Sequence, residues 1–193
     1  MNKVKKITLL PLLLICLVLL QGCAAVVVGA GVGAAAVAHD RRTVGTQLDD
    51  KTLTSRINTA LNENANLKKY AHINAYVFNG VTLLVGQAPN DDLKRQAQQV
   101  AESLPHVTKL HNQIRIGSPT VTSTRTHDIW LATKVRSVLL TDKSVDGLHI
   151  KVIVEDSEVF LMGLVTRQES NQAVEVARNI DGVARVVKAF EYL

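Results

Sequence analysis

The fold is decided by residues 72–104, which read HINAYVFNGVTLLVGQAPNDDLKRQAQQVAESL. Two β-prone runs flank Asn79-Gly80, the dipeptide that most strongly favours a two-residue hairpin turn. Asn90 then stands where a helix N-cap is expected, and the helical pattern that follows runs to about Leu104, just before Pro105. The segment therefore predicts strand, strand and helix over residues 72–78, 81–87 and 91–104.

The same arrangement occurs twice in the chain. The glycine inside the second strand recurs as Gly86 and Gly163, and Thr166 with Glu169 forms a capping box that starts a second-copy helix. We therefore predict an internal repeat at residues 50–116 and 128–193, each copy ordered helix, strand, strand, helix, strand. Apolar positions of the first helix recur 78 residues apart: Leu53, Ile57, Ala60 and Leu61 match Leu131, Val135, Val138 and Leu139.

Each copy is predicted to be an α+β unit in which two helices cover one face of a three-stranded mixed sheet. Its strand–helix–strand portion requires a right-handed crossover if those strands are parallel. A unit of about 65 residues builds only a small core, so we expect the two copies to stabilise each other. Residues 117–127, rich in serine and threonine, are predicted to be the linker. The remaining strands are expected at residues 109–116, 148–154, 158–165 and 183–190.

The N-terminus has the composition of a bacterial export signal. Lysines at positions 3, 5 and 6 precede an apolar segment, Ile7–Leu20, that is shorter than the roughly 20 residues of a membrane span. Leu20-Gln21-Gly22-Cys23 then matches the lipobox of bacterial lipoproteins, whose cysteine is acylated and becomes the first residue after cleavage. Residues 1–22 are therefore predicted to be a lipoprotein signal peptide and Cys23 the lipidated residue. Ordinary cleavage nearby and an uncleaved helix through residues 24–38 are the alternatives.

The segment after the cysteine indicates where the protein is anchored. In similar bacterial lipoproteins an aspartate after the acylated cysteine favours the inner membrane, whereas this chain has Ala24. We therefore expect an outer-membrane lipoprotein that faces the periplasm, with residues 23–49 as its lipidated N-terminus and tether. Arg41 and Arg42, at the end of the apolar stretch, are interpreted as a solvated pair rather than as contacts to lipid headgroups.

Composition excludes several classes of function. The formal net charge of +5 falls to +2 without the three signal-peptide lysines, which argues against nucleic-acid binding. No cysteine follows Cys23, so the folded part can hold neither a disulfide nor a thiolate metal site. The histidines lack the spacing of metal ligands, and no serine stands in a nucleophile elbow. We expect a monomer without enzymatic activity, metal or cofactor.

The first helix of the second copy has an unusual outer face. With Trp130 at zero and 100° per residue, Lys134, Ser137 and Thr141 fall within about 40° of it, and Leu140 lies nearby, off the core stripe. A tryptophan suits the headgroup boundary of a membrane, and a lysine is attracted to anionic lipid. Packing of this face against the first copy or the linker is the alternative. The aligned positions of the first copy are all polar: Thr52, Arg56, Thr59 and Asn62.

The glycine in each second strand, and the turn Gly182-Val183 before the last strand, resemble the BON-domain family. The resemblance covers both repeats and implies two tandem BON domains. The first copy departs from the pattern with His106-Val107, which leaves the geometry of that turn open.

The resemblance implies a non-enzymatic envelope protein that binds anionic phospholipid, notably phosphatidylglycerol, through the first helix of the second domain. It also implies a role in outer-membrane integrity and enrichment at division sites. An adaptor for the outer-membrane β-barrel assembly machinery, or a stress-protective chaperone, is the alternative. The lipid-binding residues are predicted to be Trp130, Lys134, Val135, Ser137, Leu140 and Thr141.

Overall fold

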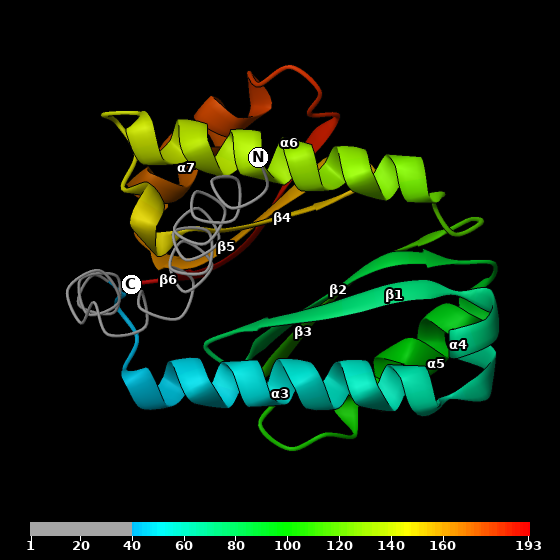
Figure 1. The fold of residues 1–193 in the computed structure, drawn as a ribbon. Coiled ribbons are helices and arrows are strands. Elements are labelled where there is room, and N and C mark those ends of the chain that lie inside the picture. The colour runs from blue at the N-terminus through cyan, green and yellow to red at the C-terminus, as the bar shows by residue number, and fades with distance from the viewer. Residues whose placement is uncertain (1–39) are drawn as a thin grey trace, which may run out of the picture. The chain divides into compact units, whose positions relative to one another are not determined.

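The structure is a computed structural model that describes residues 40–193 (Figure 1). The predicted signal peptide, Cys23 and most of the predicted tether lie outside the described residues. Within residues 40–193, no helix combines the length and apolar character that crossing a membrane requires.

Two repeats of the same topology make up residues 40–193. Repeat 1 contains α3 (Val44–Glu63), α4 (Ala65–Tyr70), β1 (His72–Phe78), β2 (Val81–Ala88), α5 (Asp91–Glu102) and β3 (Lys109–Ile116). Repeat 2 contains α6 (Thr122–Thr141), the 3-10 turn η3 (Gly147–His149), β4 (Lys151–Glu155), β5 (Glu158–Val165), α7 (Arg167–Arg178) and β6 (Arg185–Tyr192). In each three-stranded sheet the middle strand pairs antiparallel with the first and parallel with the third. The predicted α+β fold with two mixed sheets is confirmed.

Local signals in the sequence act as expected. Asn79 and Gly80 both have positive φ and join β1 to β2 with Phe78 opposite Val81. The side chain of Asn90 accepts a hydrogen bond from the Leu93 amide at the start of α5. The capping box of Thr166 and Glu169 is present at the start of α7.

Several boundaries differ from the predicted ones. Helix α3 begins at Val44, capped by the Thr43 hydroxyl, so the end of the predicted tether is helical. Helix α6 begins at Thr122, so residues 122–127 of the predicted linker form its first turns. The helical turns at residues 122–127 are largely exposed and carry no apolar stripe. Hydrophobic periodicity in the sequence therefore could not predict them. The short helix α4 was also not predicted, and β4 starts later than expected because η3 precedes it.

The turn before each third strand keeps one geometry despite the change from glycine to histidine. Gly182 has a φ of 100° and His106 a φ of 74°, so both occupy the left-handed region. Histidine is among the side chains that enter this region more readily than most. In both repeats the turn leads to the same backbone bond to the hairpin, from Thr108 N–H to the Gly80 carbonyl and from Ala184 N–H to the Ser157 carbonyl. The departure from the family pattern therefore leaves the turn unchanged.

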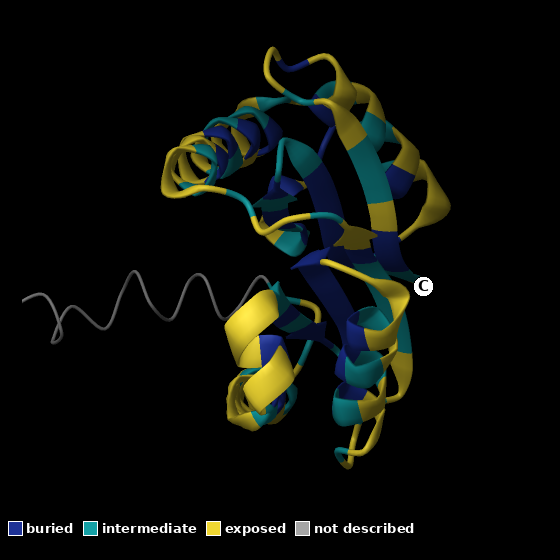
Figure 2. Ribbon diagram, turned by 90° about the vertical axis from the view of Figure 1, so that its right-hand side faces the viewer, coloured by how far each residue is buried: buried dark blue, intermediate teal, exposed yellow. Residues whose placement is uncertain are grey.

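The two sheets share a core. In each repeat the helices cover one face of the sheet, and the opposite faces of the two sheets pack against each other, giving layers of helix, sheet, sheet and helix (Figures 1 and 2). Strand β2 is consequently buried at every position. Residues 40–193 form one compact unit, which is the packing that mutual stabilisation of the two copies requires. The shared core contains Phe78, Val81, Leu83 and Val85 from repeat 1 and Ile153, Phe160, Met162 and Ala189 from repeat 2.

Candidate functional site

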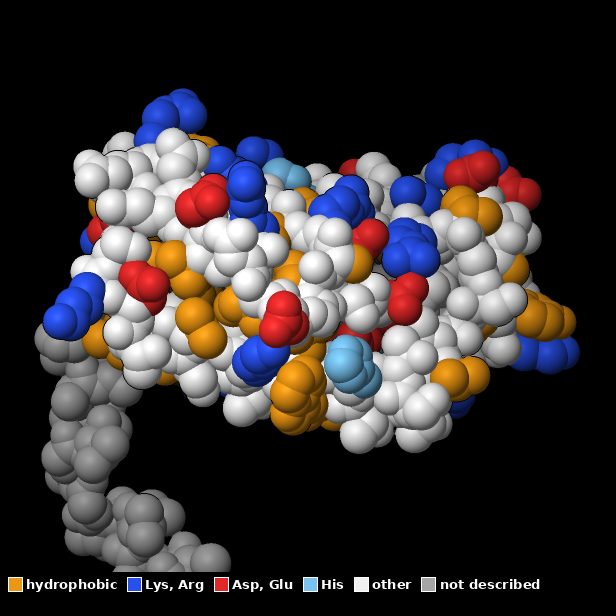
Figure 3. Space-filling view, turned by 90° about the horizontal axis from the view of Figure 1, so that it is seen from above, with side chains coloured by type: hydrophobic (Ala, Val, Ile, Leu, Met, Phe, Trp, Pro, Cys, Tyr) orange, Lys and Arg blue, Asp and Glu red, His pale blue; other side chains and the backbone are white. Residues whose placement is uncertain are grey.

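Helix α6 displays large apolar side chains to solvent. Ile129 is 70% exposed, Trp130 55% and Leu140 47%. The inner stripe of the same helix, Leu131, Val135 and Leu139, is buried in the core of repeat 2. Figure 3 looks onto the side of Figure 1 on which α6 lies and shows hydrophobic side chains at the surface among charged ones. The exposed residues therefore add nothing to the core that α6 already completes.

Trp130 is held by its neighbours but remains open to solvent. The Lys134 ammonium lies 5.2 Å from the Trp130 ring centroid and donates a hydrogen bond of 3.0 Å to the carbonyl of Asp181. The centroid of the His127 ring lies 5.6 Å from that of the Trp130 ring. The alternative in which Trp130 packs against the first repeat is wrong, because the repeats meet through their sheets instead. An indole and a cation are thus displayed together.

The predicted set of lipid-binding residues changes by two residues in the structure: one is buried, and one exposed apolar residue was not predicted. Trp130, Ser137, Leu140 and Thr141 are exposed and Lys134 is half-buried, as a surface requires. Val135 is fully buried, so its assignment to lipid binding was wrong; it belongs to the core stripe. Ile129 was missed. We define the α6 outer face as Ile129, Trp130, Lys134, Ser137, Leu140 and Thr141.

Comparison with α3 would have found Ile129. The residues 78 positions earlier than Ile129, Trp130 and Leu140 are Lys51, Thr52 and Asn62, all exposed. The same fold position therefore carries polar side chains in repeat 1 and apolar ones in repeat 2. Since both helices pack on their sheets in the same way, the apolar display is not a requirement of the fold.

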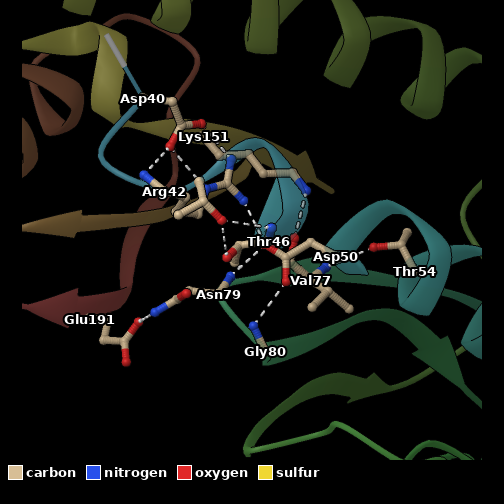
Figure 4. A network of polar contacts seen from close by, with 11 residues as sticks. Asp40, Arg42, Thr46, Asp50, Thr54, Val77, Asn79, Gly80, Lys151 and Glu191 are labelled. Carbon is tan, nitrogen blue, oxygen red and sulfur yellow. Dashed lines mark hydrogen bonds and ion pairs between the residues drawn. The ribbon is translucent and has the colours of Figure 1, made fainter. Parts of the chain in front are cut away.

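The two arginines before α3 are both paired. Arg41 forms a bidentate contact with Glu169, at 2.6 and 2.9 Å, and donates a further hydrogen bond to the Leu164 carbonyl. Arg42 pairs with Asp40 and Asp50 and lies 3.7 Å from the Phe78 ring centroid (Figure 4). The interpretation as a solvated pair was wrong. Arg41 ties the start of the described chain to repeat 2, and Arg42 ties it to repeat 1.

Each hairpin turn is held by a buried aspartate that the sequence did not single out. Asp50 accepts hydrogen bonds from the backbone N–H groups of Asn79 and Gly80, at 2.6 and 2.9 Å (Figure 4). Asp128, 78 residues later, accepts from those of Asp156 and Ser157, at 2.8 and 2.9 Å. The spacing of 78 residues between Asp50 and Asp128, which equals that of the repeat, was the signal in the sequence. Both aspartates have a structural role, since they hold the hairpin turns. Within residues 40–193 no group of side chains is arranged to hold a metal.

The Arg41–Glu169 pair makes stability depend on pH. The hydrogen bond from Arg41 is the main reason that the pKa of Glu169 falls from 4.5 to about 2. A lowered pKa stabilises the fold above pH 4.5, and this contribution is lost as the pH falls toward about 2. Arg41→Gln is expected to remove part of the acid dependence of unfolding over this range. The effect is about 1 kcal/mol or less, because both side chains still contact water.

Urea unfolding at several pH values measures this. Arg178→Gln is the matched control, since its pair with Glu175 lies on the exposed surface of α7. It should leave the dependence as in the parent protein. An unchanged acid slope in Arg41→Gln would contradict the expectation.

The fold and the α6 outer face together define a two-repeat α+β protein that displays apolar side chains of one helix to solvent. The chain belongs to the BON family: the BON-domain model matches residues 49–118 and 127–193. It is similar to "Outer membrane lipoprotein DolP" of Haemophilus influenzae, with 40% identity over 184 residues and 95% of each chain covered. The protein is thus a non-enzymatic, DolP-like BON-domain lipoprotein of the outer membrane.

Two further relatives cover most of the chain. One is the "21 kDa hemolysin" of Actinobacillus pleuropneumoniae, 38% identical over 154 residues, with 80% of this chain and 79% of the relative covered. The other is "Osmotically-inducible protein Y" of Escherichia coli, 27% identical over 146 residues, with 74% and 72% covered.

Proposed function

We propose that the protein binds anionic phospholipid, phosphatidylglycerol in particular, through the α6 outer face. Acylation of Cys23 would hold it at the outer membrane, where this binding supports membrane integrity, with enrichment at division sites. The observation that carries the proposal is the difference between the repeats. Repeat 2 exposes Ile129, Trp130 and Leu140 where repeat 1 exposes Lys51, Thr52 and Asn62.

The chemistry of this face suits the boundary between headgroups and acyl chains. An indole has an apolar body and a polar N–H, and an amphipathic helix gains affinity from the apolar area that it buries in the interface. Lys134 beside the indole adds about 1 kcal/mol of attraction to an anionic surface.

Net charge does not explain binding through this repeat. Residues 128–193 carry eight bases and ten acids, a net −2, whereas residues 50–116 carry eight bases and five acids, a net +3. Charge alone would bring repeat 1 to an anionic membrane. Binding through α6 must therefore depend on the apolar side chains that this helix exposes. Replacing these side chains by polar ones should weaken binding more than added salt does.

Vesicle binding by residues 24–193, which lack the anchor, tests the proposal. Trp130 is the single tryptophan, so its fluorescence is assignable. A blue shift is expected with vesicles that contain phosphatidylglycerol and not with neutral vesicles. In co-sedimentation, Trp130→Glu with Leu140→Glu should reduce binding at least tenfold.

The first repeat supplies a matched control. Thr52→Glu with Asn62→Glu places the same charges on α3 and should leave binding within about twofold, because these residues are already polar. A folded Trp130→Glu, Leu140→Glu protein that binds as before would overturn the proposal. An absent blue shift would favour the adaptor or the chaperone alternative. Suppression of the aggregation of a client protein would then favour the chaperone.

A further inference from the structure

The free edge of β1 is closed by side chains. Ala75 exchanges two hydrogen bonds with the Asn58 side chain, at 2.8 and 3.0 Å. The Val77 N–H donates to the Thr54 hydroxyl at 3.1 Å, and the Val77 carbonyl accepts from the Lys151 ammonium at 3.2 Å. All four outward backbone groups of these two residues are satisfied, so the edge cannot pair with another strand.

The equivalent edge of β4 lacks these partners. Both hairpins close with a two-residue turn, Phe78 opposite Val81 and Glu155 opposite Glu158, so Val152 and Val154 correspond to Ala75 and Val77. The residues that match Thr54 and Asn58 are Ala132, which has no polar group, and Arg136, which has no acceptor. Among the side chains of residues 40–193, none hydrogen-bonds to the backbone of Val152 or Val154. Four backbone groups of β4 are left for a partner.

This edge lines a groove of about 360 Å³ between α6 and β1. Ile129, Ala132 and Arg136 line its helix side, and His72 and Tyr76 come from β1. The floor is β4 itself, Lys151–Glu155. A strand edge within a groove is the arrangement by which proteins bind extended peptides.

The groove is lined by more basic than acidic side chains, Arg125, Arg136 and Lys151 against Asp128 and Glu155. Arg136 makes no ion pair with another residue of the described chain, and the Arg125 guanidinium donates only to the Thr120 carbonyl. The two acids present are already engaged. Asp128 holds the hairpin turn, and Glu155 accepts a hydrogen bond from Gln87, while burial raises its pKa and favours its neutral form.

We propose that the outer edge of β4 binds an extended, acidic peptide segment of a partner protein as an additional strand. The main chain of the segment would bond to Val152 and Val154, and a carboxylate would pair with Arg136. This goes beyond lipid binding and uses another side of α6. Ala132 and Arg136 lie about 120° to 160° around the helix from Trp130, whereas Ile129 borders both the groove and the α6 outer face.

A heptapeptide of alternating valine and glutamate is the probe, added to the mature protein in lipid nanodiscs and followed by amide NMR. We expect chemical-shift changes and at least tenfold slower hydrogen exchange at the Val152 and Val154 amides. The Ala75 and Val77 amides should not change, since they are already bonded.

The first repeat provides the decisive variant. Ala132→Thr with Arg136→Asn transplants the Thr54 and Asn58 pair onto α6 and should abolish the response to the peptide. Circular dichroism and vesicle binding should stay as in the parent, which separates this result from failure of the lipid proposal. An absent response in the parent protein, a response that persists in the variant, or equal binding of a valine–lysine heptapeptide would overturn the inference.

Discussion

Replacing Phe160 by alanine is expected to lower the free energy of unfolding by about 3–5 kcal/mol, the usual cost of truncating a buried aromatic side chain. Phe160 is 1% exposed and lies in the core that the two sheets share. The cavity would therefore open between the repeats, and repeat 1 should lose stability although the substitution lies in repeat 2.

Urea unfolding combined with amide exchange measures both effects. Phe190→Ala is the matched control, because Phe190 belongs to the core of repeat 2 alone. Both variants should destabilise repeat 2. Under conditions in which repeat 2 remains folded, only Phe160→Ala should reduce the protection of repeat 1 amides from hydrogen exchange. Unchanged protection in repeat 1, or a loss below about 1 kcal/mol, would contradict a shared core.

Asp50→Ala is expected to destabilise the protein by about 3–4 kcal/mol, the lower part of the cost of breaking a buried ion pair by removing one partner, because Arg42 keeps Asp40. The carboxylate of Asp50 accepts hydrogen bonds from two turn amides and from Arg42. The substitution removes this acceptor from all three donors. Asp128→Ala should cost less, about 2–3 kcal/mol, the value of hydrogen bonds to a charged group. The position that matches Arg42 is Thr120, so Asp128 has no equivalent ion pair to lose.

Thermal and urea unfolding of the two alanine variants give the comparison. Arg42→Met in the Asp50→Ala background is the control: Arg42 keeps Asp40 as a partner, so this further change should alter stability by less than the loss of Asp50 itself. Equal destabilisation by Asp50→Ala and Asp128→Ala would show that Arg42 contributes nothing at this site.

The sequence was sufficient for features that depend on neighbouring residues. The hairpin at Asn79-Gly80, the Asn90 cap and the capping box at Thr166 are local, and the repeated apolar stripe follows from helical period alone. These signals determined the order of the elements and the three-stranded mixed sheets. The outer face of α6 was largely predictable in the same way, because the two copies could be compared position by position.

What the sequence did not reveal depends on residues far apart in the chain. Arg41 and Glu169 are separated by 128 positions, and no local pattern marks them as a pair. Periodicity also does not distinguish a polar residue that holds a buried turn, such as Asp128, from one that faces water. Val135 was misassigned although its own stripe placed it in the core, and Ile129 was overlooked because it precedes the tryptophan.

The shared core also limits how such a duplicated chain can diverge. Each sheet has one face against its own helices and the other against its twin, so substitutions on either face disturb tight packing. New binding surfaces can therefore arise at the outer helix faces and at the strand edges. One copy can then keep a polar outer surface while its twin acquires new contacts, at little cost to the common fold.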